Sequence, residues 1–190
     1  MKYNIVYLTL GGGKFLGQLL TVGLNDLEKE YFDTYDKNHI AWMKREDMFF
    51  YNENISMSCS DWYTFDETAK LENLIFINTI DKESSDKIEQ RNQYVSTNMK
   101  NPKIRDVRMK YHNECYRFLK YNNINFFDFD YRDFWNKDKF LHSMLEFGKH
   151  FKINFNIEVL QYAQKKWIYS NIQKMNKVKK YTKFTKIGRS

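Results

Sequence analysis

Short apolar runs alternate with helix-like segments along the 190 residues of this chain. Residues 3–10 are almost continuously apolar, a pattern typical of a strand that is buried on both faces of a parallel sheet. Residues 73–77 and 124–129 predict two further strands. Because helical spacing separates these runs, the pattern predicts an α/β fold with a mostly parallel sheet and helices on both faces.

Helices are predicted over 14–27, from about 84 to 99, after the break at Asn101-Pro102, and over 137–151 and 157–172. One face of the helix after Pro102 carries Ile104, Val107, Tyr111, Cys115, Phe118 and Leu119. Residues 28–65 are polar and aromatic, with short strand candidates only at 39–43 and 48–51. The pattern therefore predicts a single α/β domain over 1–172 and a C-terminal tail over 173–190.

Charge separates the tail from the rest of the chain. The formal net charge is +7, from 31 basic and 24 acidic residues. From Asn171 onward there is no acid, and the seven basic residues are Lys174, Lys177, Lys179, Lys180, Lys183, Lys186 and Arg189. The other 24 basic residues equal the acidic ones in number, which argues against a nucleic-acid-binding face on the domain. The tail fits either a solvated end or a contact with a polyanion.

Cysteine use and hydropathy bear on location. Two cysteines, Cys59 and Cys115, make neither a disulfide framework nor a metal site, so a reducing compartment fits best. The apolar run at 3–10 is too short for a membrane span, and glycines follow it. The sequence therefore predicts a cytoplasmic protein with no membrane span.

The segment Gly11-Gly12-Gly13-Lys14 stands between the first strand and the first helix. Glycines allow positive φ, and the first N–H groups of a helix, with the helix dipole and a lysine, favour an anion such as phosphate. The alternative is a tight turn that holds no ligand. An ATP-type phosphate loop would have glycine and Ser/Thr where Leu8 and Phe15 stand. A Mg²⁺-dependent kinase is thus disfavoured, and a ligand that needs no metal fits better.

The layout resembles that of P-loop sulfotransferases, especially the short sulfotransferase-like proteins of phages and marine bacteria. The similarity lies in YLTLGGGKFLGQLL, in LENLIFINTIDKESSDKIEQRN, and in the stretch from NINFFDFDYRDFWNKDKF to the terminal helices. The resemblance implies a three-layer P-loop/Rossmann-like sandwich and, for a phage-encoded protein, the cytoplasm of a host.

The resemblance implies a nucleotide donor, 3′-phosphoadenylyl sulfate, and no metal. Its 5′-phosphosulfate would be held by the opening loop, that is, by Gly11, Gly12, Gly13, Lys14 and Phe15. Lys14 would also act in catalysis, by stabilising charge on the bridging oxygen. The family holds the 3′-phosphate with an Arg directly after the second strand and a Ser on the next helix. Ser84 or Ser85 matches the Ser, but no Arg occurs there before Arg91.

A sulfotransferase also needs a general base near its acceptor. His39 and Glu46 lie between the first and second strands, where such a base could sit, although packing or surface exposure explains His39 equally. His112, His142 and His150 fall on predicted helices and are interpreted as surface residues. Nothing in the sequence has the spacing of a metal site.

One further segment, 126–133, has two interpretations. It would place carboxylates at the carboxyl end of a strand, where α/β sites form. Alternatively, Phe127 and Phe129 pack on one sheet face while the acids cap the turn.

Two functions follow as hypotheses. The first is a sulfotransferase that moves a sulfuryl group to a hydroxyl or amine of a small-molecule or carbohydrate acceptor. The second is a non-catalytic phage or host-interaction protein that keeps the fold and binds a partner or polyanion through its basic tail.

Overall fold

The computed structural model describes residues 1–8, 10–34, 54–92 and 101–187. Its centre is a four-stranded parallel sheet of β1 (Tyr3–Tyr7), β2 (Ile55–Cys59), β3 (Leu74–Asn78) and β4 (Phe127–Asp130). The strand order is β2-β1-β3-β4, and every neighbouring pair is parallel. The α/β fold predicted from the sequence is confirmed.

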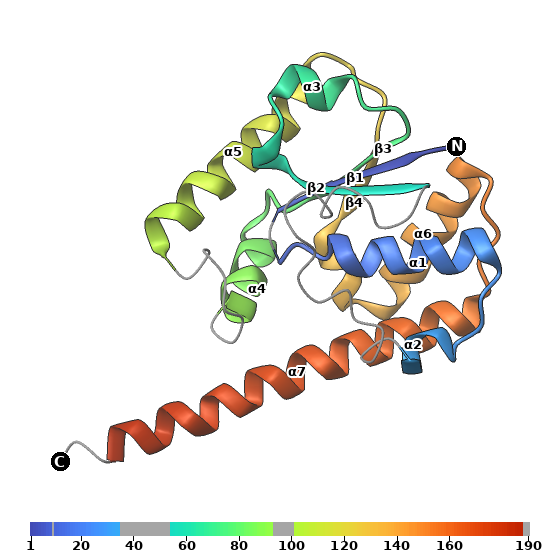
Figure 1. Ribbon diagram of the computed structural model, residues 1–190. Helices are drawn as coiled ribbons and strands as arrows, with labels where there is room; N and C mark the ends of the chain where they lie inside the picture. The colour runs from blue at the N-terminus through green and yellow to red at the C-terminus, as the bar shows by residue number, and fades with distance from the viewer. Residues whose placement is uncertain (9, 35–53, 93–100, 188–190) are drawn as a thin grey trace.

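Helices cover both faces of this sheet (Figure 1). On one face lie α1 (Gly13–Asn25), α6 (Lys137–Phe151) and the first half of α7 (Ile157–Ile187). On the other face lie α3 (Phe65–Ala69) and α5 (Pro102–Tyr121). Shorter or peripheral elements connect them: α2 (Tyr31–Thr34), η2 (Ser60–Trp62), α4 (Lys82–Asn92) and η4 (Tyr131–Trp135).

Alternation along the strands builds two cores of unequal size. Ile75 and Ile77 of β3 point into the larger core with α1, α6 and α7, whereas Phe76 packs with Cys115 and Leu119 of α5. Successive side chains of a strand point to opposite faces. Because helices cover both faces here, successive positions of the strand are apolar. This is why β1 and β3 could be predicted from the sequence.

Strand β2 lies in the segment 28–65, where the sequence pattern gives no clear prediction. Its three apolar residues alternate with Ser56 and Ser58, a pattern that does not stand out from the polar residues around it. All five residues are nevertheless buried, because β2 is also covered on both faces. The predicted strands at 39–43 and 48–51 lie outside the described residues.

Helix α7 is longer than the sequence pattern predicts. It runs from Ile157 to Ile187 without a break, and its C-terminal part projects away from the sheet (Figure 1). The basic segment that begins after Asn171 therefore continues the last helix of the domain. Among the helices of the described residues, none combines the length and the apolar character that crossing a membrane requires.

Candidate functional site

The strand order brings two loops to one switch point between β1 and β3, at the carboxyl edge of the sheet, where folds of this kind have their ligand crevice. From β1 the chain moves to β2 on one side and then crosses to β3 on the other side of β1. In an open parallel sheet, ligands bind beyond the carboxyl ends of the strands where the order reverses in this way. Here those ends lead into the glycine loop before α1 and the short link before α4. The sequence-predicted residues Gly11–Phe15 and Ser84–Ser85 thus lie in the segments that follow two neighbouring strands, β1 and β3.

The glycine loop is a tight turn. Leu10 and Gly12 both have positive φ, 71° and 84°, and the N–H of Gly11 donates to the carbonyl of Leu8 at 2.6 Å. The apolar run predicts a strand that ends at residue 10. Because of this turn, β1 ends at Tyr7 instead. A residue with a Cβ is strained at such φ values, which accounts for glycine at position 12.

Packing also demands two of these glycines. A Cβ on Gly12 would overlap the ring of Phe134, and a Cβ on Gly13 would overlap the ring of Tyr7. Both glycines are buried. The glycines are therefore needed whether or not a ligand binds, and their presence alone is weak evidence for a phosphate.

The first turn of α1 favours an anion electrostatically. Gly12 caps the helix without a side-chain hydrogen bond, and the first turn contains Lys14 and no acid. The side chain of Phe15 is 4% exposed and stacks on Trp167, with ring centroids 5.0 Å apart. Phe15 can therefore offer a ligand only its backbone N–H, whereas Lys14 is half-buried at the start of the helix.

Thr79 is a candidate site residue that no sequence pattern singles out. It follows β3, is 1% exposed, and its Oγ1 has no hydrogen-bond partner in the described structure. Asn78 turns toward α5, since its amide donates to Asp128 at 2.6 Å, so alternation turns Thr79 toward α1. A buried hydroxyl without a partner is costly. Thr79 follows β3, the neighbour of the strand whose end leads into the glycine loop.

The start of α4 differs from that of α1. Asp81 accepts a hydrogen bond from the backbone N–H of Ser84 at 2.9 Å and another from the Ser84 hydroxyl at 2.6 Å. The Ser85 hydroxyl donates to the carbonyl of Asp81 at 3.3 Å. Burial alone would raise the pKa of Asp81, but these hydrogen bonds and the charge of Arg132 outweigh burial and lower it. Both candidate serines are thus engaged with Asp81, and Ser84 is fully buried.

Arg132 brings to the start of α4 an arginine, which the residues directly after β3 lack. It comes from η4, and its Nε lies 3.5 Å from Asp81 Oδ2. It also binds Asp130 with two nitrogens, Nε at 3.0 Å and Nη2 at 2.5 Å from Oδ2. Hydrogen bonds and the charge of Asp130 raise the pKa of Arg132 further above its ordinary value. No sequence signal near β3 could have revealed it, because 51 positions separate the two residues.

The segment 126–133 follows the second of its two interpretations. Phe127 and Phe129 both pack on the larger core, and Asp130 accepts from the backbone N–H of Arg132 at 2.9 Å, capping η4. Asp128 binds Asn78 and the hydroxyl of Tyr116. These carboxylates are structural. Across the described ranges, no group of three or more metal-ligating side chains is present.

Three predictions concern histidines and the general base. His39 and Glu46 lie outside the described residues. His142 and His150 are exposed, as predicted. The prediction for His112 was wrong: it is 0% exposed and stacks on Phe76 at 4.6 Å. A helical histidine is buried here because this part of α5 packs on β3, and the ring finds partners at both nitrogens.

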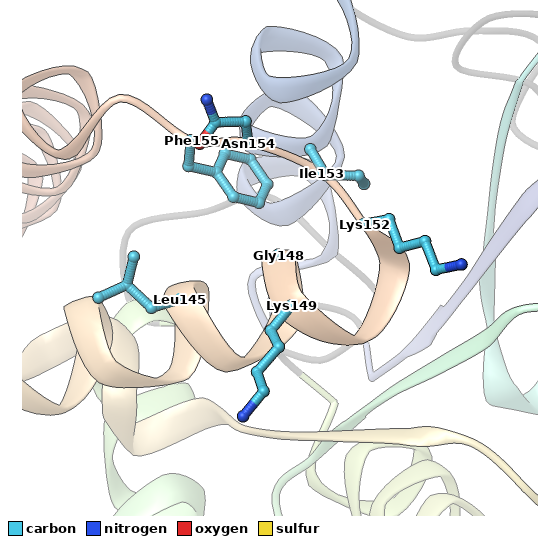
Figure 2. A pocket seen from close by; sticks show the side chains of 7 residues that line it. All are labelled: Leu145, Gly148, Lys149, Lys152, Ile153, Asn154 and Phe155. Carbon is cyan, nitrogen blue, oxygen red and sulfur yellow. The ribbon is translucent and has the colours of Figure 1, made fainter.

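A pocket of 340 Å³ lies elsewhere, at the link between α6 and α7. Figure 2 shows Leu145 and Phe155 beside it and Lys149 and Lys152 at its rim. Phe151, at the same end of α6, contacts Tyr3 at the start of β1, so this is the amino edge of the sheet. The pocket contains no sequence-predicted site residue.

Comparisons with protein-family models, with curated proteins and with solved structures found no match to this chain. The likeness to sulfotransferases therefore rests on the residues quoted for it, and the described structure establishes the α/β fold.

Proposed function

We propose that this protein binds the phosphate-bearing 5′ end of a nucleotide at the glycine loop, in the manner of a sulfotransferase, and that sulfuryl transfer is its reaction. The observation that supports this most is the uncapped, acid-free first turn of α1 at the crevice between β1 and β3. A helix N-terminus in that position favours an anion without a metal. The reaction itself rests on the resemblance.

Thr79 supports the same ligand position. Its hydroxyl is unpartnered, and Thr79 and the first turn of α1 follow two adjacent strands, β3 and β1. A phosphate oxygen there would supply the acceptor that Thr79 lacks. Lys14 would add a charge-assisted hydrogen bond, which is stronger than a neutral one.

Calorimetric titration tests this proposal. Wild-type protein should bind AMP without Mg²⁺. Lys14→Ala should weaken binding about tenfold or more, and Thr79→Val about threefold to tenfold, because each removes a hydrogen bond to a charged ligand. The valine is isosteric and removes an unpaired hydroxyl, so Thr79→Val should be at least as stable as wild type.

Lys149→Ala is the matched control, because this exposed lysine lines the pocket at the opposite, amino edge of the sheet. It should leave the affinity unchanged. Equal weakening by Lys149→Ala would mean a diffuse charge effect. Absence of nucleotide binding by the wild type would refute the proposed function.

A second candidate, binding of a polyanion without catalysis, is favoured by one observation. Helix α7 continues away from the sheet up to Ile187, and the sequence from Asn171 onward has seven cations and no acid. Polyanions bind such segments mainly through release of counterions.

Deletion of residues 174–190 should abolish salt-sensitive binding to single-stranded nucleic acid and leave AMP binding unchanged. The measurement is affinity against salt concentration, since the logarithm of the binding constant falls linearly with that of salt. Loss of AMP binding in the shortened chain would show that domain and tail do not act separately.

A further inference from the structure

Two helices of eleven or more residues start at the same crevice. Their first turns differ in whether a carboxylate of the protein already occupies the position of an anion. Helix α1 starts at Gly12, with no side chain at its cap and no acid in its first turn. Helix α4 starts after Asp81, whose carboxylate accepts the Ser84 N–H, and has Glu83 in its first turn. A carboxylate at that position takes the place that an external anion would occupy.

The carboxylate of Asp81 is held firmly in this place. Its Oδ1 accepts from the Ser84 backbone and its Oδ2 from the Ser84 hydroxyl, which is fully buried. The hydroxyl that the resemblance assigns to a 3′-phosphate is therefore already donating to the protein's own carboxylate. Ser85 donates to the backbone carbonyl of Asp81.

The nearby cation is also neutralised. Arg132 makes a two-nitrogen contact with Asp130 and lies 3.5 Å from Asp81. Two carboxylates thus face one guanidinium, and Glu83 adds a third negative charge nearby. A phosphate dianion brought to this point would meet these carboxylates and two serine hydroxyls that already donate to Asp81, so the described residues do not fit a 3′-phosphate.

We propose that Asp81 fills the second anion position of the crevice, so that the site selects a nucleotide with its phosphate or phosphosulfate at the 5′ end alone. The donor class would be a nucleoside 5′-phosphosulfate without a 3′-phosphate. The choice of nucleotide rests on the proposed function, whereas the filling of the α4 position by Asp81 does not.

The test compares AMP with adenosine 3′,5′-bisphosphate by calorimetry on the full-length protein. The wild type should bind the bisphosphate no more tightly than AMP. Asp81→Ser keeps a capping hydroxyl but removes the charge and leaves space beside Arg132. It should shift the ratio of the two affinities toward the bisphosphate by about tenfold or more.

Glu83→Gln is the control. It removes one negative charge from the same helical turn without vacating the cap, and it should move the ratio by less than about threefold. A wild type that already prefers the bisphosphate tenfold would overturn the inference. An unchanged ratio in Asp81→Ser would do the same while leaving nucleotide binding intact.

A second readout separates this inference from the proposed function. Inorganic phosphate is titrated into both proteins, and the backbone amide signal of Ser84 is followed by NMR. The signal should shift in Asp81→Ser and stay fixed in the wild type. If no nucleotide binds but this difference is seen, the proposed function fails and the role of Asp81 stands. If neither protein responds to phosphate, the role of Asp81 is refuted.

Discussion

Replacement of His112 by Gln should flatten the acid dependence of stability. Burial lowers the pKa of His112 from 6.5 to about 4, since the ring is fully enclosed. Its Nε2 donates to the carbonyl of Ile77 at 3.0 Å, and its Nδ1 accepts from the Ser60 hydroxyl at 2.9 Å. Neither nitrogen meets a carboxylate. The neutral ring links the segment after β2 to the end of β3.

The direction of the effect follows from this lowered pKa. Between pH 6.5 and about 4 the unfolded chain binds a proton at His112 and the folded chain does not. The neutral His112 ring therefore makes its full contribution to the unfolding free energy above pH 6.5. That contribution is lost as the pH falls through about 4. The shift corresponds to about 3 kcal/mol of unfolding free energy.

Urea unfolding at several pH values between 7 and 4 measures this. His112→Gln should be about 2 kcal/mol less stable than wild type at neutral pH, because the stacking on Phe76 and one hydrogen bond are lost. Between pH 7 and pH 4, His112→Gln should lose about 3 kcal/mol less unfolding free energy than wild type does. The exposed His142→Gln should behave as wild type. Parallel pH profiles for His112→Gln and wild type would contradict a neutral buried ring.

Replacement of Gly12 by Ala should destabilise the protein by about 3 kcal/mol, in the absence of any ligand. The residue has a φ of 84°, which strains an alanine. Its new methyl group would also overlap Phe134, which is fully buried and stacked on Phe129 at 4.8 Å.

Gly17→Ala provides a matched control on the same helix. Its Cβ would lie 2.6 Å from Met57 Sδ, which can shift, and alanine favours the helix. Its unfolding free energy should stay within about 1 kcal/mol of wild type. If thermal or urea unfolding shows equal effects for the two variants, the packing explanation of the loop is wrong. A loss of nucleotide binding in Gly12→Ala would not by itself identify a ligand contact.

Local patterning made much of the fold predictable. Strands β1 and β3 are apolar except for one asparagine each, because both of their faces are covered. Helix α6 has the predicted bounds because Asn136 caps it and its apolar residues recur with helical spacing. The glycine loop was recognisable because glycine and lysine stand together between a strand and a helix.

Periodicity was less informative where a helix extends beyond the sheet. It placed Val107 on the buried face of α5, yet Val107 is 69% exposed. A helix of 20 residues is about 30 Å long, whereas a strand of five residues spans about 17 Å. The first turns of α5 therefore have no sheet to cover them, and only the second half of the helix is buried.

The sequence by itself determined the α/β class, the buried strands β1 and β3, the loop before α1 and the uneven distribution of charge. Each of these depends on neighbouring residues. The tertiary structure alone decided that His112 is buried and that Arg132 reaches Asp81, at the start of α4, from η4. These contacts join residues that are distant along the chain or depend on which helix face meets the sheet. Strand order and packing set them, and no local pattern of residue types records either.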